Sequence, residues 1–169
     1  MIGDLHTAAL VGRDGSIDWL CLPHFDSAAC FAKLLGGEDN GYWRIAPAGG
    51  PGTVLATRRQ YRHGTLVLET EFDTADGSIR LTDCMPIREE SPQVIRLVEV
   101  LRGQVTIRME LCIRFGYGEM IPWVTQHDGL LTATTGPDSL AMWTRAETHG
   151  EGMKTVSEIT LKEGQQLPF

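Results

Sequence analysis

The chain has 169 residues, 42% of them hydrophobic, and its 22 acidic residues outnumber its 15 basic residues to give a net charge of -7. This length is usual for one domain with its own hydrophobic core. The acidic balance argues against binding to nucleic acid, and no apolar stretch reaches the roughly 18 to 20 residues that a membrane-spanning helix needs.

Most of the chain consists of short apolar or alternating segments that are separated by Gly, Asp and Pro. This pattern predicts an all-β fold, an antiparallel β-sandwich, in a single domain that spans residues 1–169. Residues 7–11 and 16–22 flank Asp14-Gly15, a sequence typical of a tight hairpin. Further strands are expected at residues 42–46, 53–61, 65–73, 78–85, 93–102, 105–115, 123–126, 129–134, 139–144 and 155–161.

One short helix is expected near residues 28–35. Asp26 and Ser27 precede it and are suited to accept hydrogen bonds from its first amides, and Gly36-Gly37 follows its end. Its apolar side chains would cover a sheet edge or opening.

The segments on either side of Gly103 differ in pattern. Residues 93–102 alternate imperfectly, so a helix remains an alternative there, and Gly103 is expected to form a turn. The next segment alternates strictly, which places five apolar side chains on one face that must belong to the core. These side chains are Val105, Ile107, Met109, Leu111 and Ile113.

Leu167 and Phe169 resemble the first buried residues of another strand. Because a domain rarely ends in an unfinished element, we expect the domain to be truncated at its C-terminal end.

No common catalytic or cofactor motif occurs in the chain: it contains no Gly-rich phosphate loop, no His-Glu-x-x-His and no Gly-x-Ser-x-Gly. The four cysteines lack the paired spacing of zinc sites, so we expect buried free thiols, no metal and no cofactor. The histidines occur singly, although His6 and His24 could approach each other across the first hairpin.

Four acidic residues cluster near the N-terminus, where a pair of carboxylates would suit sugar hydrolysis. Each has a structural explanation, such as a turn for Asp14 and a helix cap for Asp26. We therefore expect no catalytic pair. The residues are Asp4, Asp14, Asp18 and Asp26.

The four tryptophans, in or beside expected strands, are expected to fill the core. Stacking on a sugar ring is the alternative, and Trp19 and Trp123 are its first candidates.

Two segments near the N-terminus, IGDLHTAALV at residues 2–11 and DGSIDWLCLP at residues 14–23, resemble the start of prokaryotic family 15 glycoside hydrolases of the glucoamylase and trehalase kind. The resemblance extends over nearly the whole chain, through FAKLL, GYWRI and TDCMP. The chain is similar to the trehalase-like N-terminal domain of that family.

The resemblance implies a galactose-mutarotase-like supersandwich joined to a C-terminal (α/α)6 barrel, the catalytic domain, which hydrolyses α-glucosides with inversion. The two catalytic glutamates belong to the barrel, so the resemblance implies no catalytic residue here. It places Trp19, Pro23, His24, Phe25 and Asp26 at the interdomain face. Alternatively, Phe25 and Asp26 only staple and cap the expected helix.

The resemblance thus favours a non-catalytic domain that supports the barrel of the same polypeptide. The alternative is a carbohydrate-binding module that contacts α-glucan or trehalose, for example through Trp123. We expect a cytoplasmic protein with no nucleic-acid or membrane partner, and self-association where an apolar interdomain surface is left uncovered.

Overall fold

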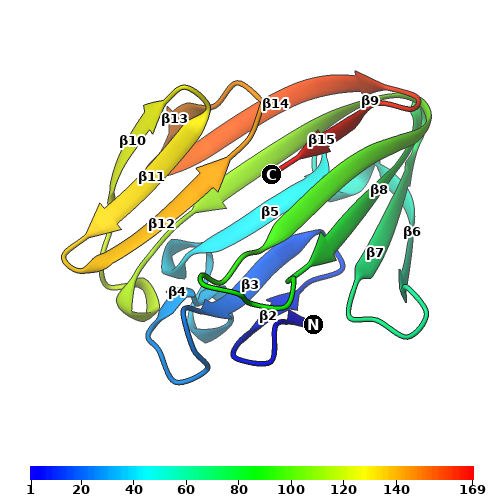
Figure 1. Ribbon diagram of the computed structural model, residues 1–169. Coiled ribbons are helices and arrows are strands. Elements are labelled where there is room, and N and C mark those ends of the chain that lie inside the picture. The colour runs from blue at the N-terminus through cyan, green and yellow to red at the C-terminus, as the bar shows by residue number, and fades with distance from the viewer.

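The computed structural model describes residues 1–169 and consists almost entirely of antiparallel strands in two curved layers (Figure 1). The first layer is continued at one edge by β14 and β13, and β4 pairs with β3. Its strands are β1 (Ile2–Gly3), β2 (Ala8–Val11), β3 (Ser16–Cys21), β4 (Ala29–Phe31), β5 (Tyr42–Pro47), β13 (His149–Glu151) and β14 (Lys154–Lys162).

The second layer is a meander that ends on β15, and a separate three-stranded sheet lies beside these layers. The meander contains β6 (Val54–Tyr61), β7 (Leu68–Thr74), β8 (Gly77–Cys84) and β15 (Gln166–Pro168). The separate sheet contains β10 (Trp123–His127), β11 (Leu130–Thr135) and β12 (Asp138–Trp143). Four short 3-10 turns complete the fold: η1 (Lys33–Leu35), η2 (Glu38–Asn40), η3 (Pro51–Thr53) and η4 (Gly116–Gly118). None of these turns has the length or apolar character of a membrane-spanning helix.

The strand β9 (Ile95–Cys112) joins the two layers: its first half pairs with β8 and β15, and its second half pairs with β5 and β14. The expected turn at Gly103 and the alternative of a helix before it are therefore wrong. Gly103 has a φ of 74°, and a Cβ atom there would lie 2.2 Å from the Asp76 carbonyl oxygen. Glycine thus lets one strand pass between the layers without ending.

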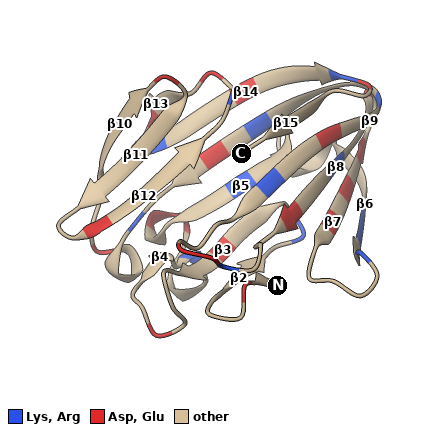
Figure 2. Cartoon of the chain, in the orientation of Figure 1, with Lys and Arg blue, Asp and Glu red and all other residues tan.

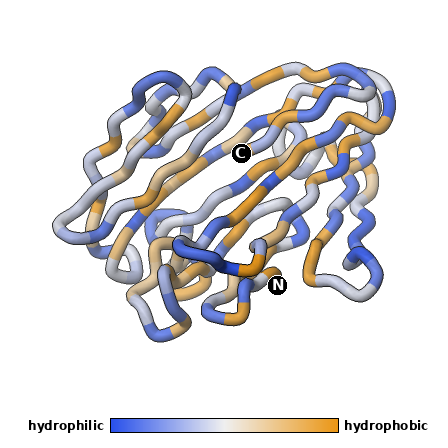
Figure 3. Tube along the Cα trace, viewed as in Figure 1, coloured by the Kyte–Doolittle hydropathy of each residue, from blue (hydrophilic) through white to orange (hydrophobic).

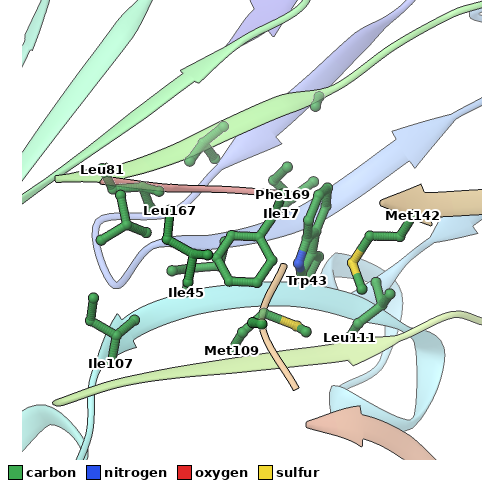
Figure 4. Close-up of a cluster of buried hydrophobic side chains, with 14 of the residues drawn as sticks. Ile17, Trp43, Ile45, Leu81, Ile107, Met109, Leu111, Met142, Leu167 and Phe169 are labelled. Atoms are coloured by element: carbon green, nitrogen blue, oxygen red, sulfur yellow. The ribbon is translucent and has the colours of Figure 1, made fainter. Parts of the chain in front are cut away.

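The predicted apolar face is confirmed, since four of its side chains lie in β9, the fifth, Ile113, follows directly after it, and all five are buried. Figure 4 shows Ile107, Met109 and Leu111 facing Leu167 and Phe169 across the core. The alternation of hydrophobic and hydrophilic positions along the strands is visible in Figure 3. The all-β prediction is therefore correct, and so is the expectation of a strand at Leu167.

The helix expected near residues 28–35 is absent. Ala29–Phe31 forms β4 against β3, and only Lys33–Leu35 makes a single 3-10 turn, whose Leu34 and Leu35 are exposed. Pairing with a neighbouring strand has overridden the local helical pattern. No side-chain hydrogen bond caps the turn, so the proposed capping role of Asp26 and Ser27 is also wrong.

The tryptophans divide into two kinds. Trp43 lies in the core as expected and Trp19 is half-buried, whereas Trp123 is 79% exposed and Trp143 is 49% exposed. Trp143 follows the buried Met142 and so lies on the opposite face of its strand. The core prediction is wrong for these two, because they belong to the outer face of the three-stranded sheet.

One ion pair is enclosed in the core. Arg96 donates from Nε to Asp83 Oδ1 at 2.8 Å, and both side chains are fully buried. The same guanidinium donates to the carbonyl oxygens of Trp43 and Gly15, each at 2.6 Å. Arg96 therefore links β8 and β9 of one layer to β5 and the first hairpin of the other.

Charged side chains elsewhere lie mainly on outer faces. Acidic and basic residues lie near one another on β7, β8 and β9 (Figure 2). Arg58 of β6 donates hydrogen bonds to the carboxylates of Glu71 and Asp73 on β7. Such exposed pairs contribute little to stability. All four cysteines are free and three of them are buried, as expected; Cys84 is partly exposed.

Candidate functional site

Most of the predicted site residues lie on or beside loops at one end of the first layer. We call the segments 4–7, 22–28, 33–40 and 116–120 the loop surface. They lie before β2, between β3 and β5, and after β9 (Figure 1). The turn η4 contacts both β4 and η2, which joins the last of these segments to the others.

A buried carboxylate fixes two of these loops. Asp4 Oδ1 accepts hydrogen bonds from the backbone amides of His6 and Thr7, and Asp4 Oδ2 lies 2.7 Å from Nη2 of Arg88. Burial raises the pKa of Asp4, but the hydrogen bonds from Thr7 and Arg88 outweigh that effect, and the net pKa is lowered. Arg88 also donates to the Pro23 carbonyl oxygen at 2.6 Å, so one side chain holds both loops in place.

The loop after β3 carries four of the predicted site residues. Pro23, His24, Phe25 and Asp26 are all exposed, and the Phe25 amide donates to the His6 carbonyl oxygen at 3.0 Å. The rings of His6 and His24 lie 6.1 Å apart, which confirms that they approach each other. Because the expected helix is absent, the alternative reading of Phe25 and Asp26 as its staple and cap is wrong.

Trp19 lies on β3 and packs on the small buried cluster of Cys21, Ala29 and Ala32. Its ring lies 6.0 Å from that of Tyr117 in η4, which has a positive φ of 64°. The Asn40 side chain donates to the Tyr117 carbonyl oxygen at 3.0 Å and supports this conformation. Trp19 thus meets the loop surface through Tyr117, a residue that the sequence analysis missed although glycines flank it.

The loop surface exposes several large apolar side chains. Leu5 is 83% exposed, Phe25 is 64% exposed, and Leu34 and Leu35 are 58% and 64% exposed. Leu5 also has a positive φ of 75°, a conformation that a leucine rarely adopts. Exposed apolar groups on a loop that is held by a buried ion pair are typical of an interaction surface.

The carboxylates near this end have structural partners. Asp14 accepts a hydrogen bond from the Ser16 amide, and Asp18 accepts one from the Ser16 hydroxyl and lies 3.6 Å from Lys33 Nζ. No group of three or more His, Cys, Asp or Glu side chains is arranged to hold a metal ion. The carboxylates of Asp14 and Asp18 thus both hydrogen-bond to Ser16 and take part in local structure.

Trp123, the remaining candidate, lies in the three-stranded sheet. It lines a groove with β13 and β14 that is separate from the loop after β3.

These features define the class of the protein: an all-β sandwich domain with an apolar loop surface at one end. Residues 1–151 match the trehalase-like N-terminal family, so the chain belongs to the family of trehalase-like N-terminal domains.

Curated relatives agree with this assignment. The chain is 35% identical to a trehalase of Thermoplasma volcanium over 147 residues, which are 83% of the chain and 23% of that protein. It is 34% identical to trehalase 2 of Sulfolobus acidocaldarius, over 70% of the chain and 19% of that protein. A trehalase of Mycobacterium tuberculosis is 24% identical over 98% of the chain and 28% of its own length. The chain thus spans between 19% and 28% of the length of these relatives, and no solved structure gives a significant match.

Proposed function

We propose that this chain is the non-catalytic N-terminal domain of an inverting α-glucoside hydrolase of the glucoamylase and trehalase kind, and that it supports a C-terminal (α/α)6 barrel of the same polypeptide. Family membership supports this proposal, as do relatives about four times as long that are named trehalases. The choice between trehalose, maltooligosaccharides and another α-glucoside would lie with the barrel.

The observation that carries the proposal is the loop surface. Four large apolar side chains are exposed on this surface: Leu5 and Phe25 on the two loops that the Asp4–Arg88 pair holds in place, and Leu34 and Leu35 on η1. An interface gains affinity when its loops are already ordered before binding. Phe25 and Leu35 would be anchors in the contact with the barrel, and Pro23 and His24 would lie beside them.

The non-catalytic role is supported by the state of the carboxylates. Inverting hydrolysis needs two carboxyl groups about 6.5 to 9.5 Å apart on either side of the sugar. Asp4, Asp14 and Asp18 are instead held by backbone amides, Arg88, Ser16 and Lys33. We also propose a cytoplasmic location, which the four unpaired cysteines support.

The test uses the full-length enzyme with Phe25→Asp or Leu35→Asp, and Leu55→Asp as the control. Leu55 is 71% exposed on β6, outside the loop surface. We expect the first two variants to lower the melting temperature of the enzyme and to speed proteolytic cleavage between the domains, while the control does neither. Equal behaviour of all three variants would overturn the proposed interface.

The same surface should cause self-association of the 169-residue chain. We expect light scattering to detect oligomers that Phe25→Asp reduces. A strict monomer at high concentration would count against this expectation.

A further inference from the structure

A groove of about 560 Å³ lies between β10 and the turn that joins β13 to β14. Figure 1 shows these strands at the same end of the molecule. Two cations line the groove, Arg114 just after β9 and Lys154 at the start of β14, and the apolar side chains of Leu111, Ile113 and Leu131 line it as well. We infer that this groove binds the carboxylate of a small organic acid, with the two cations on the carboxylate and the apolar side chains on its hydrocarbon part.

Arg114 is a buried cation without an acidic partner. It is 7% exposed, and all the acceptors of its guanidinium are backbone carbonyl oxygens. Two further arginines with side chains no more than 9% exposed each have a carboxylate: Arg88 lies 2.7 Å from Asp4, and Arg96 lies 2.8 Å from Asp83. Because a buried charge is costly unless it is paired, the missing counter-charge of Arg114 favours an anionic ligand.

One edge of the Arg114 guanidinium has no protein acceptor. Its Nη1 donates to the Ile113 carbonyl oxygen at 2.8 Å, and its Nη1 and Nη2 both donate to the Met153 carbonyl oxygen at 3.3 Å. These bonds leave the Nε hydrogen and the second Nη2 hydrogen, which lie side by side on the other edge of the planar group. Two such N–H groups match the two oxygens of a carboxylate.

Lys154 adds a second positive charge. Its Nζ donates to the Tyr42 hydroxyl at 3.0 Å and forms no ion pair. The Tyr42 hydroxyl in turn donates to Glu110 at 3.1 Å, but Glu110 is already paired with Arg44 at 2.6 Å and with Arg108 at 3.0 Å. The charge of Lys154 is therefore not offset by a carboxylate of its own.

The acidic side chain that lines the groove, Glu151, does not supply the missing counter-charge. Its Oε1 accepts a hydrogen bond from Arg108 at 2.9 Å, and its Oε2 lies 3.9 Å from His149 Nε2. The groove thus combines uncompensated positive charge with an apolar wall, which suits an acid that carries a hydrocarbon chain. Its volume lies within the range of about 300 to 1,000 Å³ that is usual for small-molecule sites.

This inference goes beyond the proposed support of a barrel, since neither Arg114 nor Lys154 belongs to the loop surface. The test titrates the 169-residue chain with hexanoate, hexanamide and inorganic sulfate at neutral pH, and follows heat and melting temperature. We expect saturable binding of hexanoate at one site, with a dissociation constant of about 1 mM or lower. Hexanamide lacks the charge and sulfate lacks the hydrocarbon chain, so each should bind at least about tenfold more weakly. Absence of saturable hexanoate binding by the folded chain would overturn the inference, as would equal binding of hexanamide or sulfate.

Variants assign the binding to the two cations. Arg114→Gln should weaken hexanoate binding by about tenfold to a hundredfold, the usual effect of losing a hydrogen bond to a charged group. Lys154→Gln should weaken it by about threefold or more, and it decides the test if Arg114→Gln does not fold. The matched control is Arg145→Gln, because Arg145 is exposed over Trp143 and does not line the groove. It should leave the affinity within about twofold, and a loss equal to that of the groove variants would overturn the inference.

The full-length enzyme distinguishes a free acid from an acidic side chain of the longer polypeptide. We expect it to bind hexanoate as the 169-residue chain does. Binding by the 169-residue chain alone would show that the longer polypeptide fills the groove, and would overturn the assignment to a small organic acid.

Discussion

The buried pair between Arg96 and Asp83 allows a sharp test of how the two layers are joined. Asp83→Asn would leave the fully buried guanidinium without a counter-charge while keeping the size of the side chain. The two backbone acceptors, on Trp43 and Gly15, would remain in place. The substitution therefore removes charge compensation from a site that water does not reach.

Removing one partner of a buried ion pair costs about 3 to 5 kcal/mol. Domains of this kind have a free energy of unfolding of about 5 to 15 kcal/mol, so the loss would be a large share of the total. At about 2 to 4 °C per kcal/mol for this chain length, the melting temperature should fall by about 6 to 20 °C. Urea unfolding, followed by the fluorescence of the tryptophans, measures the loss of unfolding free energy. Thermal unfolding, followed by circular dichroism, measures the fall in melting temperature.

Asp73→Asn is the control, since Asp73 is an acidic residue of the adjacent strand β7 and pairs with Arg58 in solvent. We expect it to change the midpoint of unfolding far less than Asp83→Asn does. If the two substitutions had equal effects, the reasoning about the buried pair would be refuted.

Three further outcomes are expected. Because the pKa of Asp4 is lowered in the fold by hydrogen bonds that outweigh burial, Asp4 stabilises the fold above its unfolded pKa of about 3.9, and this contribution is lost as the pH falls through the folded pKa. The difference in unfolding free energy between wild type and Asp4→Asn should thus shrink in denaturation series from pH 7 to pH 3, and a constant difference would contradict this. Burial raises the pKa of Cys30 to about 12, so iodoacetamide, which alkylates thiolates, should not modify Cys30 in the native chain at pH 8. Rapid modification of Cys30, detected by peptide mass mapping, would argue against its burial. Gly103→Ala should lower the urea midpoint more than Gly164→Ala, since both glycines have positive φ but only at Gly103 would a Cβ meet backbone within 2.2 Å; the reverse order would show that β9 does not need this close approach.

The sequence predicted the parts of the fold that depend on periodicity. The strict alternation from Val105 to Ile113 identified the core face of β9, and Asp14-Gly15 marked the first hairpin. The helix near residues 28–35 was wrong because buried residues such as Phe31 pair with β3, a long-range contact that the local pattern does not contain. Gly103 was misread because a positive φ suits a bend within a strand as well as a turn.

The candidate site was only partly predictable. Pro23 to Asp26 lie on one exposed loop, whereas Arg88, which bonds to Pro23, and Tyr117, which lies against Trp19, belong to distant segments that only the tertiary fold brings close. The exposure of Trp123 was missed because alternation tells which residues share a face of a sheet, and not which face meets solvent.

The central claim is that this domain supports hydrolysis carried out elsewhere in the polypeptide. The most direct measurement compares glucose release from trehalose and maltose by the 169-residue chain and by the full-length enzyme. We predict release by the full-length enzyme alone. Hydrolysis by the isolated chain at a comparable rate would contradict the account.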